Sequence, residues 1–291
     1  MHRKNKMLNT QNKKILVVGL GMIGASLCRA LKKSSSYNTI QGYDIDKKIS
    51  QYAVDNDFID NFESDLKKAI EASDIVVLCV PVSQIKSTLN IVKDFFNTDK
   101  VFTDTLSTKN SILNFLSKNK YLEITNFILS HPMAGTENFG IQNSKENLFD
   151  DTVTLISPLN FSKSDNISTV KNLWKSVNSN YVEIESARHD KILSVVSHSP
   201  HILSFVLSNI TNQHNLNNET PWIYSRGSLC DMTRIANSDP KAWAGIFSDN
   251  KENIIEYIDK YVLELNNLRS IINSNNDDDL VSYLTKSKPK K

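Results

Sequence analysis

The sequence predicts an α/β, Rossmann-type dinucleotide-binding domain followed by an all-α helical domain. Three observations support this. Short apolar runs alternate with helical patterns over the first part of the chain, a Gly-x-Gly-x-x-Gly pattern directly follows the first apolar run, and no convincing strand follows residue 187. We therefore expect a nucleotide-binding domain over residues 1–185 and a helical domain over residues 186–291.

The elements of the first domain follow from β-branched apolar runs and from helical spacing between them. Strands are predicted at Lys14–Val18, Thr39–Asp44, Asp74–Pro81, Val101–Thr105, Phe127–His131, Thr152–Ser157 and Tyr181–Ile184. Helices are predicted at Ile23–Lys33, Lys48–Val54, Ser83–Phe96, Lys109–Asn119 and Ile167–Ser176. Because strands that alternate with helices form βαβ units, we expect a parallel sheet covered on both faces.

The second domain shows helical spacing throughout. Apolar residues recur at this spacing from His189 to Ile210, and Pro200 is expected to bend that helix or to mark a restart, since proline lacks a backbone donor. Lys241–Phe247 and Ile254–Ile272 continue the pattern, and a polar break at Asn273–Asp279 precedes a last short helix. These apolar faces exceed what one monomer of this size needs to cover.

Composition excludes several classes of protein. With 40% hydrophobic and 23% charged residues over 291 positions, the chain is typical of a globular protein, and a net charge of +2 does not suggest a nucleic-acid partner. The segment Ile15–Leu31 is short for a membrane span and contains Arg29, so a strand, turn and helix explain it better. Three cysteines without metal-ligand spacing favour the reducing cytoplasm and no metal site.

The run Gly19-Leu20-Gly21-Met22-Ile23-Gly24 is the predicted phosphate-binding turn. Gly19 permits the tight turn, Gly21 lets the backbone approach a pyrophosphate, and Gly24 lets helix and strand pack closely. The N–H groups at the start of the helix, from Met22 and Ile23 onward, would face the phosphates. A glycine-rich turn without a ligand is the alternative.

The second strand ends at Asp44, whose carboxylate can accept hydrogen bonds from both ribose hydroxyls and would repel a 2′-phosphate. No Arg or Lys follows at once, so NAD is favoured over NADP, although Asp44 could also cap a turn. Val80 and Pro81 are expected to line the nicotinamide ribose side of the cleft.

Three further clusters of polar residues are candidates for catalysis and substrate binding. They are Thr103–Lys109, Ser130–Glu137, and, across the helical domain, His189-Asp190, Ser197-His198-Ser199-Pro200-His201 and Asp231-Met232-Thr233-Arg234-Ile235-Ala236. Together with the glycine motif, this order of motifs over nearly the whole chain resembles the prephenate and arogenate dehydrogenase family. β-Hydroxyacid dehydrogenases share the glycine motif but not the later ones.

The resemblance implies that His131 lies beside the ring hydroxyl of the substrate. Neutral imidazole suits the removal of a hydroxyl proton as hydride leaves the carbinol carbon. Ser107 matches the family serine that hydrogen-bonds this histidine and orients nicotinamide and substrate. The loop here, Thr-Leu-Ser-Thr-Lys, departs from the more usual glycine-serine arrangement.

The resemblance also implies the substrate contacts. His201 and Arg234 match the substrate-binding pair, and a guanidinium can grip a carboxylate through two parallel hydrogen bonds. Glu137, with Thr136 beside it, matches an acidic residue near the pocket mouth, although it could also be a carboxylate at the start of a helix. Homodimerisation through the helical domain is implied as well.

Other polar residues of these clusters have structural interpretations. His189 and His198 are expected to be structural, Asp190 to be a helix N-terminal charge, and Asp231 to hold Arg234 or nearby backbone. Where the family often has a run of glycines, this chain has Arg226-Gly227-Ser228-Leu229-Cys230, which predicts a stiffer loop.

The implied reaction is oxidative decarboxylation of prephenate to 4-hydroxyphenylpyruvate with hydride transfer to NAD, in tyrosine biosynthesis, without a metal. Alternatives are arogenate as substrate, a β-hydroxyacid-type dehydrogenase, and a non-catalytic NAD-binding sensor. About 13 residues precede the first predicted strand, and 19 follow Ile272. We therefore expect no mutase domain and no separate tyrosine site, so that tyrosine would compete with prephenate in the substrate pocket.

Overall fold

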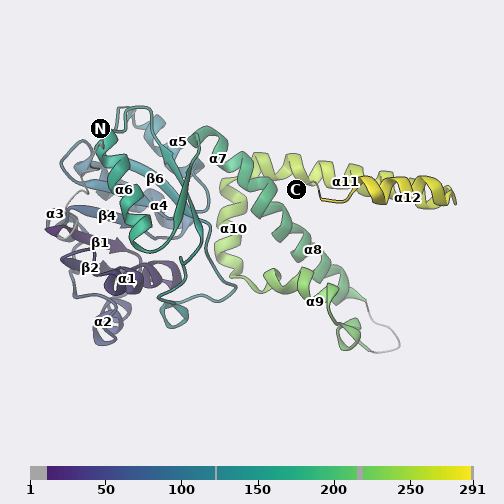
Figure 1. The fold of residues 1–291 in the computed structure, drawn as a ribbon, viewed down its shortest axis with the longest axis horizontal. Helices are drawn as coiled ribbons and strands as arrows, with labels where there is room; N and C mark the ends of the chain where they lie inside the picture. Colours follow the sequence, from purple (N-terminus) through teal and green to yellow (C-terminus); the bar gives the residue numbers. More distant parts are fainter. Residues whose placement is uncertain (1–11, 122, 215–218, 290–291) are drawn as a thin grey trace, which may run out of the picture.

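The computed structural model describes residues 12–121, 123–214 and 219–289. A twisted sheet with helices on both faces forms the N-terminal part, and a set of helices extends away from one end of it (Figure 1). This arrangement confirms the predicted fold class.

The described residues form one eight-stranded sheet in the order β3-β2-β1-β4-β5-β6-β7-β8. The strands are β1 (Lys14–Val18), β2 (Thr39–Tyr43), β3 (Asn61–Phe62), β4 (Ile75–Leu78), β5 (Val101–Asp104), β6 (Phe127–Pro132), β7 (Val153–Pro158) and β8 (Asn180–Glu183). The chain runs from β1 outward to β2 and β3, and β4 then lies on the opposite side of β1, so a topological switch point lies between β1 and β4. Ligands of open α/β sheets bind at such a point, outside the carboxyl ends of the strands.

The expectation of a wholly parallel sheet is wrong at one pair, because β6 and β7 are antiparallel. A parallel neighbour needs a long crossover, usually a helix. Residues 133–152 contain only the short 3-10 helix η4 (Ile141–Asn143), so the chain turns back beside β6 instead. The short elements β3 and α3 (Leu66–Glu71) were not predicted from the sequence.

Strand β1 shows why both faces of the sheet need helices. Ile15 and Val17 point into one hydrophobic cluster, whereas Leu16 and Val18 point into another. Helices α1 (Met22–Ser34) and α6 (Ser164–Ser176) cover the first cluster, and α3, α4 (Ile85–Val92) and α5 (Asn110–Lys118) cover the second.

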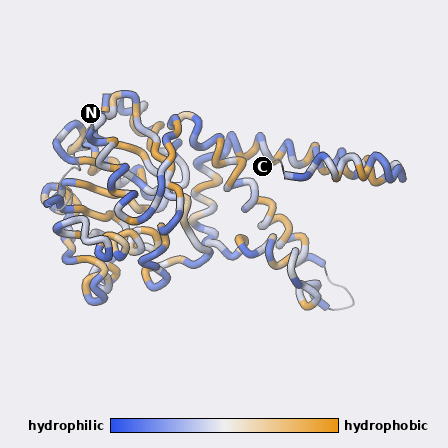
Figure 2. Tube along the Cα trace, viewed as in Figure 1, coloured by the Kyte–Doolittle hydropathy of each residue, from blue (hydrophilic) through white to orange (hydrophobic). Residues whose placement is uncertain are grey.

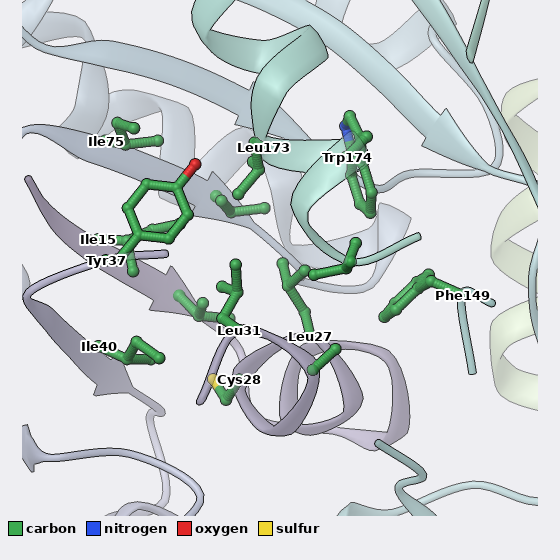
Figure 3. Close-up of a cluster of buried hydrophobic side chains, with 14 of the residues drawn as sticks. Ile15, Leu27, Cys28, Leu31, Tyr37, Ile40, Ile75, Phe149, Leu173 and Trp174 are labelled. Carbon is green, nitrogen blue, oxygen red and sulfur yellow. The ribbon is translucent and has the colours of Figure 1, made fainter. Parts of the chain in front are cut away.

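Figure 3 shows the first cluster, in which side chains of α1 meet those of the sheet and of α6. Cys28 lies in it and is fully buried, as expected for a small core residue. Cys28, Cys79 and Cys230 form no disulfide. The remaining elements of this half are α2 (Lys47–Asp55), η2 (Val82–Gln84) and η3 (Lys93–Phe95).

The C-terminal half contains helices and no sheet strand in the part of it that the structure describes. Its elements are α7 (Ser186–Leu193), the π-helical segment η5 (Ser194–His198), α8 (Ser199–Gln213), η6 (Pro221–Tyr224), α9 (Ser228–Thr233), η7 (Arg234–Asn237), α10 (Pro240–Asp249), α11 (Lys251–Asn273) and α12 (Asp277–Lys286). Helices α8 and α11 diverge from the junction with the sheet, and α12 extends beyond α11 (Figure 1). Strand β8 ends at Glu183, and α7 begins at Ser186.

Pro200 does not interrupt the helical path, because α7, η5 and α8 follow one another without a gap. It lies in the first turn of α8, directly after the π-helical segment. In this wider turn the Ser194 carbonyl oxygen accepts from the backbone N–H of Ser199. The Ser199 hydroxyl donates to the Ser194 carbonyl oxygen at 2.6 Å. Such π turns frequently lie at functional sites.

None of the described helices combines the length and the apolar character that a membrane span requires.

Candidate active site

The glycine motif forms the turn between β1 and α1, and two of its glycines have no room for a side chain. Gly19 has a φ of +94°, and a Cβ there would lie 2.7 Å from the Cys79 carbonyl oxygen. A Cβ on Gly24 would lie 1.9 Å from the Gly19 carbonyl oxygen. Gly21, in contrast, has nothing within 4 Å of its Cβ position. The turn is therefore closed toward the protein and open toward a ligand at Gly21.

Helix α1 begins directly at this open turn. Its N-cap residue is Gly21, which provides no side-chain cap. The N–H groups of the first turn, beginning with Met22 and Ile23, therefore lack an intrahelical partner. Free N–H groups together with the helix dipole favour a phosphate at this position.

Asp44 lies at the end of β2 and hydrogen-bonds backbone on two sides. Its carboxylate accepts from Leu20 N at 2.8 Å and from Asp46 N at 3.0 Å. The turn-capping interpretation of Asp44 therefore holds in this structure. A carboxylate has about four lone-pair sites, so two remain for ribose hydroxyls. The same contacts attach the glycine turn to β2 and fix where a dinucleotide would lie.

Val80 and Pro81 follow β4 on the other side of the switch point. The helix α10 packs against the turn that they begin, since a Cβ on Gly245 would lie 3.7 Å from the Val82 Cβ. The predicted nicotinamide side of the cleft is therefore bordered by both halves of the molecule.

His131, the last residue but one of β6, belongs to a hydrogen-bonded chain with residues of α7. Its Nδ1 lies 3.1 Å from Nε2 of His189, and Nδ1 of His189 lies 2.7 Å from the Asp190 carboxylate. His131 and His189 are buried, with 7% and 0% of their surface exposed. The other ring nitrogen of His131, Nε2, has no hydrogen-bond partner among the described residues. It is the atom left to act on a substrate.

Burial keeps His131 uncharged. Removal from water holds its pKa well below the usual value near 6.5, and the neighbouring His189, Lys109 and His198 lower it further. Burial also lowers the pKa of His189, an effect that its bond to Asp190 opposes. A neutral imidazole at neutral pH is the form that can accept a proton.

The strand end that carries His131 is fixed by a buried ion pair. Lys109 Nζ contacts the Asp104 carboxylate, and both side chains are fully buried. The ammonium group also donates to the carbonyl oxygens of Leu106 at 2.9 Å and Ser130 at 2.7 Å. Its three donors are thereby all used, which makes Lys109 a structural support beneath the site.

Two carboxylates of the helical half bind the first turn of α5. Asp190 accepts from Lys109 N at 2.8 Å and Asn110 N at 2.9 Å. Asp249 accepts from Thr108 Oγ1 at 2.6 Å and from Ser111 N at 3.2 Å. Asp190 is thus a helix N-terminal charge, but for a helix of the other half.

His201 stacks on Trp243, with ring centroids 3.6 Å apart. Its Nδ1 lies 2.9 Å from the Ser197 carbonyl oxygen, which must accept, so Nδ1 carries the proton and Nε2 is left for a ligand. Burial lowers the pKa of His201, the bond to Ser197 opposes this, and Arg234 lowers it further. The predicted pair, His201 and Arg234, therefore lies within electrostatic range.

Arg234 faces the loop that follows β6. Its Nη1 lies 3.4 Å from Glu137 Oε2, and the two side chains are 62% and 36% exposed. Arg234 therefore pairs with Glu137 across the two halves, not with Asp231 as one interpretation of the sequence had it. The pair is solvated and weak, so a substrate carboxylate can replace Glu137.

Two predicted site residues have local roles only in this structure. Thr136 Oγ1 lies 3.3 Å from Asn138 N within its own loop. The Ser107 hydroxyl has no hydrogen-bond partner among the described residues, and His131 contacts His189 instead. Their predicted contacts with cofactor and substrate stay predictions.

The sequence interpretation placed His189 among structural residues and gave Trp243 no role. His189 is 58 positions from His131, and no spacing rule joins a residue of a strand end to one of a distant helix. The adjacency of His189 and Asp190 was the available signal, because a carboxylate that orients an imidazole is a common feature of active sites.

These features define a nucleotide-binding oxidoreductase with a helical second domain. Residues 27–183 match the nucleotide-binding domain of prephenate dehydrogenase, and residues 185–286 match its dimerization domain. The chain belongs to the prephenate dehydrogenase family. The glycine motif precedes the matched segment, so its assignment depends on the geometry described above.

Known relatives align with nearly the full length of this chain. Cyclohexadienyl dehydrogenase of Zymomonas mobilis is 30% identical over 278 residues, which cover 94% of each chain. Prephenate dehydrogenase of Bacillus subtilis is 29% identical over 97% of this chain and 76% of its own length. The structure of A. aeolicus prephenate dehydrogenase in complex with hydroxyphenyl propionate and NAD+ aligns with a TM-score of 0.86 at 29% identity, over 98% of this chain and 97% of that one.

Proposed function

We propose that the protein catalyses the oxidative decarboxylation of prephenate to 4-hydroxyphenylpyruvate with NAD, a reaction of tyrosine biosynthesis. The observation that carries the proposal is the buried, uncharged His131 at the switch-point end of the sheet, with Nε2 unoccupied and with His201 and Arg234 on the facing half. A non-catalytic NAD-binding sensor would not need this arrangement.

NAD fits the residues present. The open backbone at Gly21 and the free N–H groups of α1 suit a pyrophosphate, and Asp44 retains acceptors for ribose hydroxyls but would repel a 2′-phosphate. When bound, the nicotinamide supplies a hydride acceptor.

The reaction needs one proton to be removed and then returned. As hydride leaves the carbinol carbon, the hydroxyl proton passes to Nε2 of His131 and a ring carbonyl forms. The ring carboxylate then leaves as CO2, and its electron pair flows into that carbonyl oxygen as the ring becomes aromatic. His131 returns the proton to this oxygen, so no net proton is released and His131 ends uncharged.

The two negative charges of the substrate account for the cationic and polar residues of the helical half that face the cleft. Prephenate carries two carboxylates, and Arg234 can bind one of them bidentately once it leaves Glu137. His201, with Nε2 unoccupied and its ring held against Trp243, offers a second polar contact of fixed orientation. Arogenate differs in the side chain, where an ammonium replaces the keto group, and it is the alternative substrate.

Steady-state assays with prephenate and arogenate, each with NAD and NADP, test the proposal. We expect NADH formation and CO2 release with prephenate, and a higher kcat/KM with NAD than with NADP. A higher kcat/KM with arogenate would reassign the substrate. Absence of turnover with either substrate would overturn the proposed activity.

We propose further that the protein is a homodimer through its helical half. Helices α8, α11 and α12 expose large apolar side chains, at Val206, Ile210, Ile258, Val262, Leu263, Leu265, Val281 and Leu284. Leu263 is 71% exposed on α11, whereas Phe161, 52% exposed, lies on the nucleotide-binding half. Light scattering at micromolar concentration should find a dimer for the wild type and Phe161→Glu, and a monomer for Leu263→Glu. A wild-type monomer would refute it.

A cytoplasmic location and the lack of a nucleic-acid partner remain proposals. They are supported by three cysteines that form no disulfide and by a net charge of +2.

A further inference from the structure

The imidazole of His131 is oriented from the other half of the molecule. His131 lies near the end of strand β6 of the sheet, whereas His189 and Asp190 belong to α7. The three side chains form one hydrogen-bonded series, with 3.1 Å between the two rings and 2.7 Å between His189 and the carboxylate. Asp190 itself is held by two backbone N–H groups of the first turn of α5.

The chemistry of these groups determines where the protons lie. An ionised carboxylate can only accept, so Nδ1 of His189 carries a proton. In a neutral His189, Nε2 is therefore bare and accepts a hydrogen bond from Nδ1–H of His131. In a neutral His131, the proton on Nδ1 leaves Nε2 bare as well. The series thus selects the one tautomer of His131 in which the atom facing the cleft is a base.

We propose that His189, oriented by Asp190, is the positioning residue of this active site, which holds His131 in the Nδ1–H tautomer and stabilises the positive charge that His131 receives. The inference depends on the proposed function, because it assigns His131 the hydroxyl proton. That proton moves to Nε2 as hydride leaves the substrate, and it returns to the ring oxygen after CO2 departs. His189 keeps its own proton throughout and acts only through its bond to His131.

The charged and titratable groups around the pair are compatible with this role. Lys109, His198 and, when it is itself protonated, His189 oppose a positive charge on His131. His189 therefore stabilises that charge in its neutral form, in which Nε2 accepts the hydrogen bond. Asp190 and Asp104 face His189 and favour a positive charge there, while Lys109 opposes it. The negative charge of the series therefore lies at Asp190. This carboxylate polarises His189, whose Nε2 becomes a better acceptor for the Nδ1–H group of His131.

Two substitutions of His189 separate positioning from packing. His189→Leu removes the acceptor, and kcat should fall about 10²–10³-fold, less than the roughly 10⁴-fold loss when the orienting carboxylate of a triad is replaced, because the partner of His131 is a neutral imidazole. His189→Gln places an amide oxygen near the former Nε2 and should stay within about 10-fold of the wild type. Dissociation constants for NAD should not change in either variant. His214→Gln, at an exposed histidine after α8, is the matched control with unchanged kinetics.

A double-mutant cycle with His131→Asn gives a result that a structural role would not produce. If His189 acts only through His131, adding His189→Leu to His131→Asn should lower kcat by less than about 3-fold further, since the effects of residues that act as a unit do not add. An additional loss of about 10²-fold would show that His189 supports the fold or another group, and would overturn the proposal.

The tautomers can be measured without turnover. Nitrogen-15 spectra of the resting protein, labelled at histidine, should show His131 and His189 both protonated at Nδ1 and bare at Nε2. Finding the proton of His131 on Nε2 would overturn the inference even if the enzyme is active. Conversely, the expected tautomers in a protein that turns over neither substrate would refute the proposed function and leave the hydrogen-bonded series intact.

Discussion

The two halves of the molecule bury their apolar residues to different extents. In the nucleotide-binding half, both faces of the sheet meet helices, and the two hydrophobic clusters of the described residues lie there. In the helical half, the buried hydrophobic residues among those described are Leu193, Ile246 and Ile254, while long stretches of α8, α11 and α12 expose theirs. Figure 2 shows hydrophobic segments along α8, outside the body of the sheet.

This difference indicates a division of labour. The first half is a complete scaffold that fixes the glycine turn, Asp44 and His131. The second half supplies His189, His201 and Arg234, and it buries few apolar residues of its own apart from the junction with the sheet. The proposed dimer would cover the rest. The active site then exists only where the halves meet. If the comparison is sound, cofactor binding and substrate binding should respond to substitutions in different halves.

The largest effect is expected at His131, the proposed reacting group, which the scaffold half contributes. His131→Asn should lower kcat by about 10²–10⁴-fold, the usual contribution of a general base, with the dissociation constant for NAD unchanged. Stopped-flow assays and cofactor titration measure the two quantities. A rise in KM alone would make His131 a binding residue. Substrate binding would then not be confined to the helical half.

Acid should destabilise the junction first. Burial lowers the pKa of His131 and His189, and that of His198 to about 4. Because these folded-state values lie below the unfolded value near 6.5, the unfolded chain binds more protons below that pH, and stability falls as the pH is lowered. For His198 the loss amounts to about 3 kcal/mol once the pH reaches about 4.

Denaturant unfolding between pH 7.5 and 4.5 measures this loss. His198→Asn keeps an acceptor for Asn250 Nδ2, which lies 3.0 Å from His198 Nδ1, but removes the titrating group. Its unfolding free energy should fall less steeply with decreasing pH than that of the wild type. Equal slopes would show that His198 does not contribute to the acid sensitivity.

Arg234 tests the helical half as the substrate-binding one. Arg234→Gln should raise KM for prephenate by about 2–3 kcal/mol, which is roughly 30–150-fold, because a charged hydrogen bond is lost. NAD binding should be nearly unchanged. Glu137→Gln is the matched control, since it removes the solvated partner of Arg234 but leaves the guanidinium available. An unchanged KM in Arg234→Gln would place Arg234 in a structural ion pair.

The sequence was sufficient where a local pattern encodes the structure. The glycine turn, the strand that leads to Asp44 and the strand that contains His131 all follow from residues within one short segment. The failures involve distant partners. Strand direction is not encoded in apolar runs, so the antiparallel pairing of β7 was missed, and the contact between His189 and His131 depends on the packing of α7 against β7.

The smallest effect is expected from substitutions at the junction between the two halves. Asp249 accepts from Thr108 Oγ1 at 2.6 Å and Ser111 N at 3.2 Å, so it caps α5 from the other half. Asp65 caps α3 within one half, where it accepts from Lys67 N at 2.9 Å. Removing either carboxylate leaves helix donors without a partner, at about 1 kcal/mol for a cap.

Asp249→Ala should therefore cost about 1–2 kcal/mol in unfolding free energy, and Asp65→Ala about 1 kcal/mol. The two should differ more in catalysis than in stability. Because α5 follows the Lys109 that supports the end of β6, loosening its contact with α10 should shift His131 relative to His189 and lower kcat several-fold. Asp65→Ala should leave kcat unchanged. Urea unfolding and steady-state rates on both variants decide the matter. Equal kcat in the two would show that Asp249 only caps a helix, and that the halves are aligned by their other contacts.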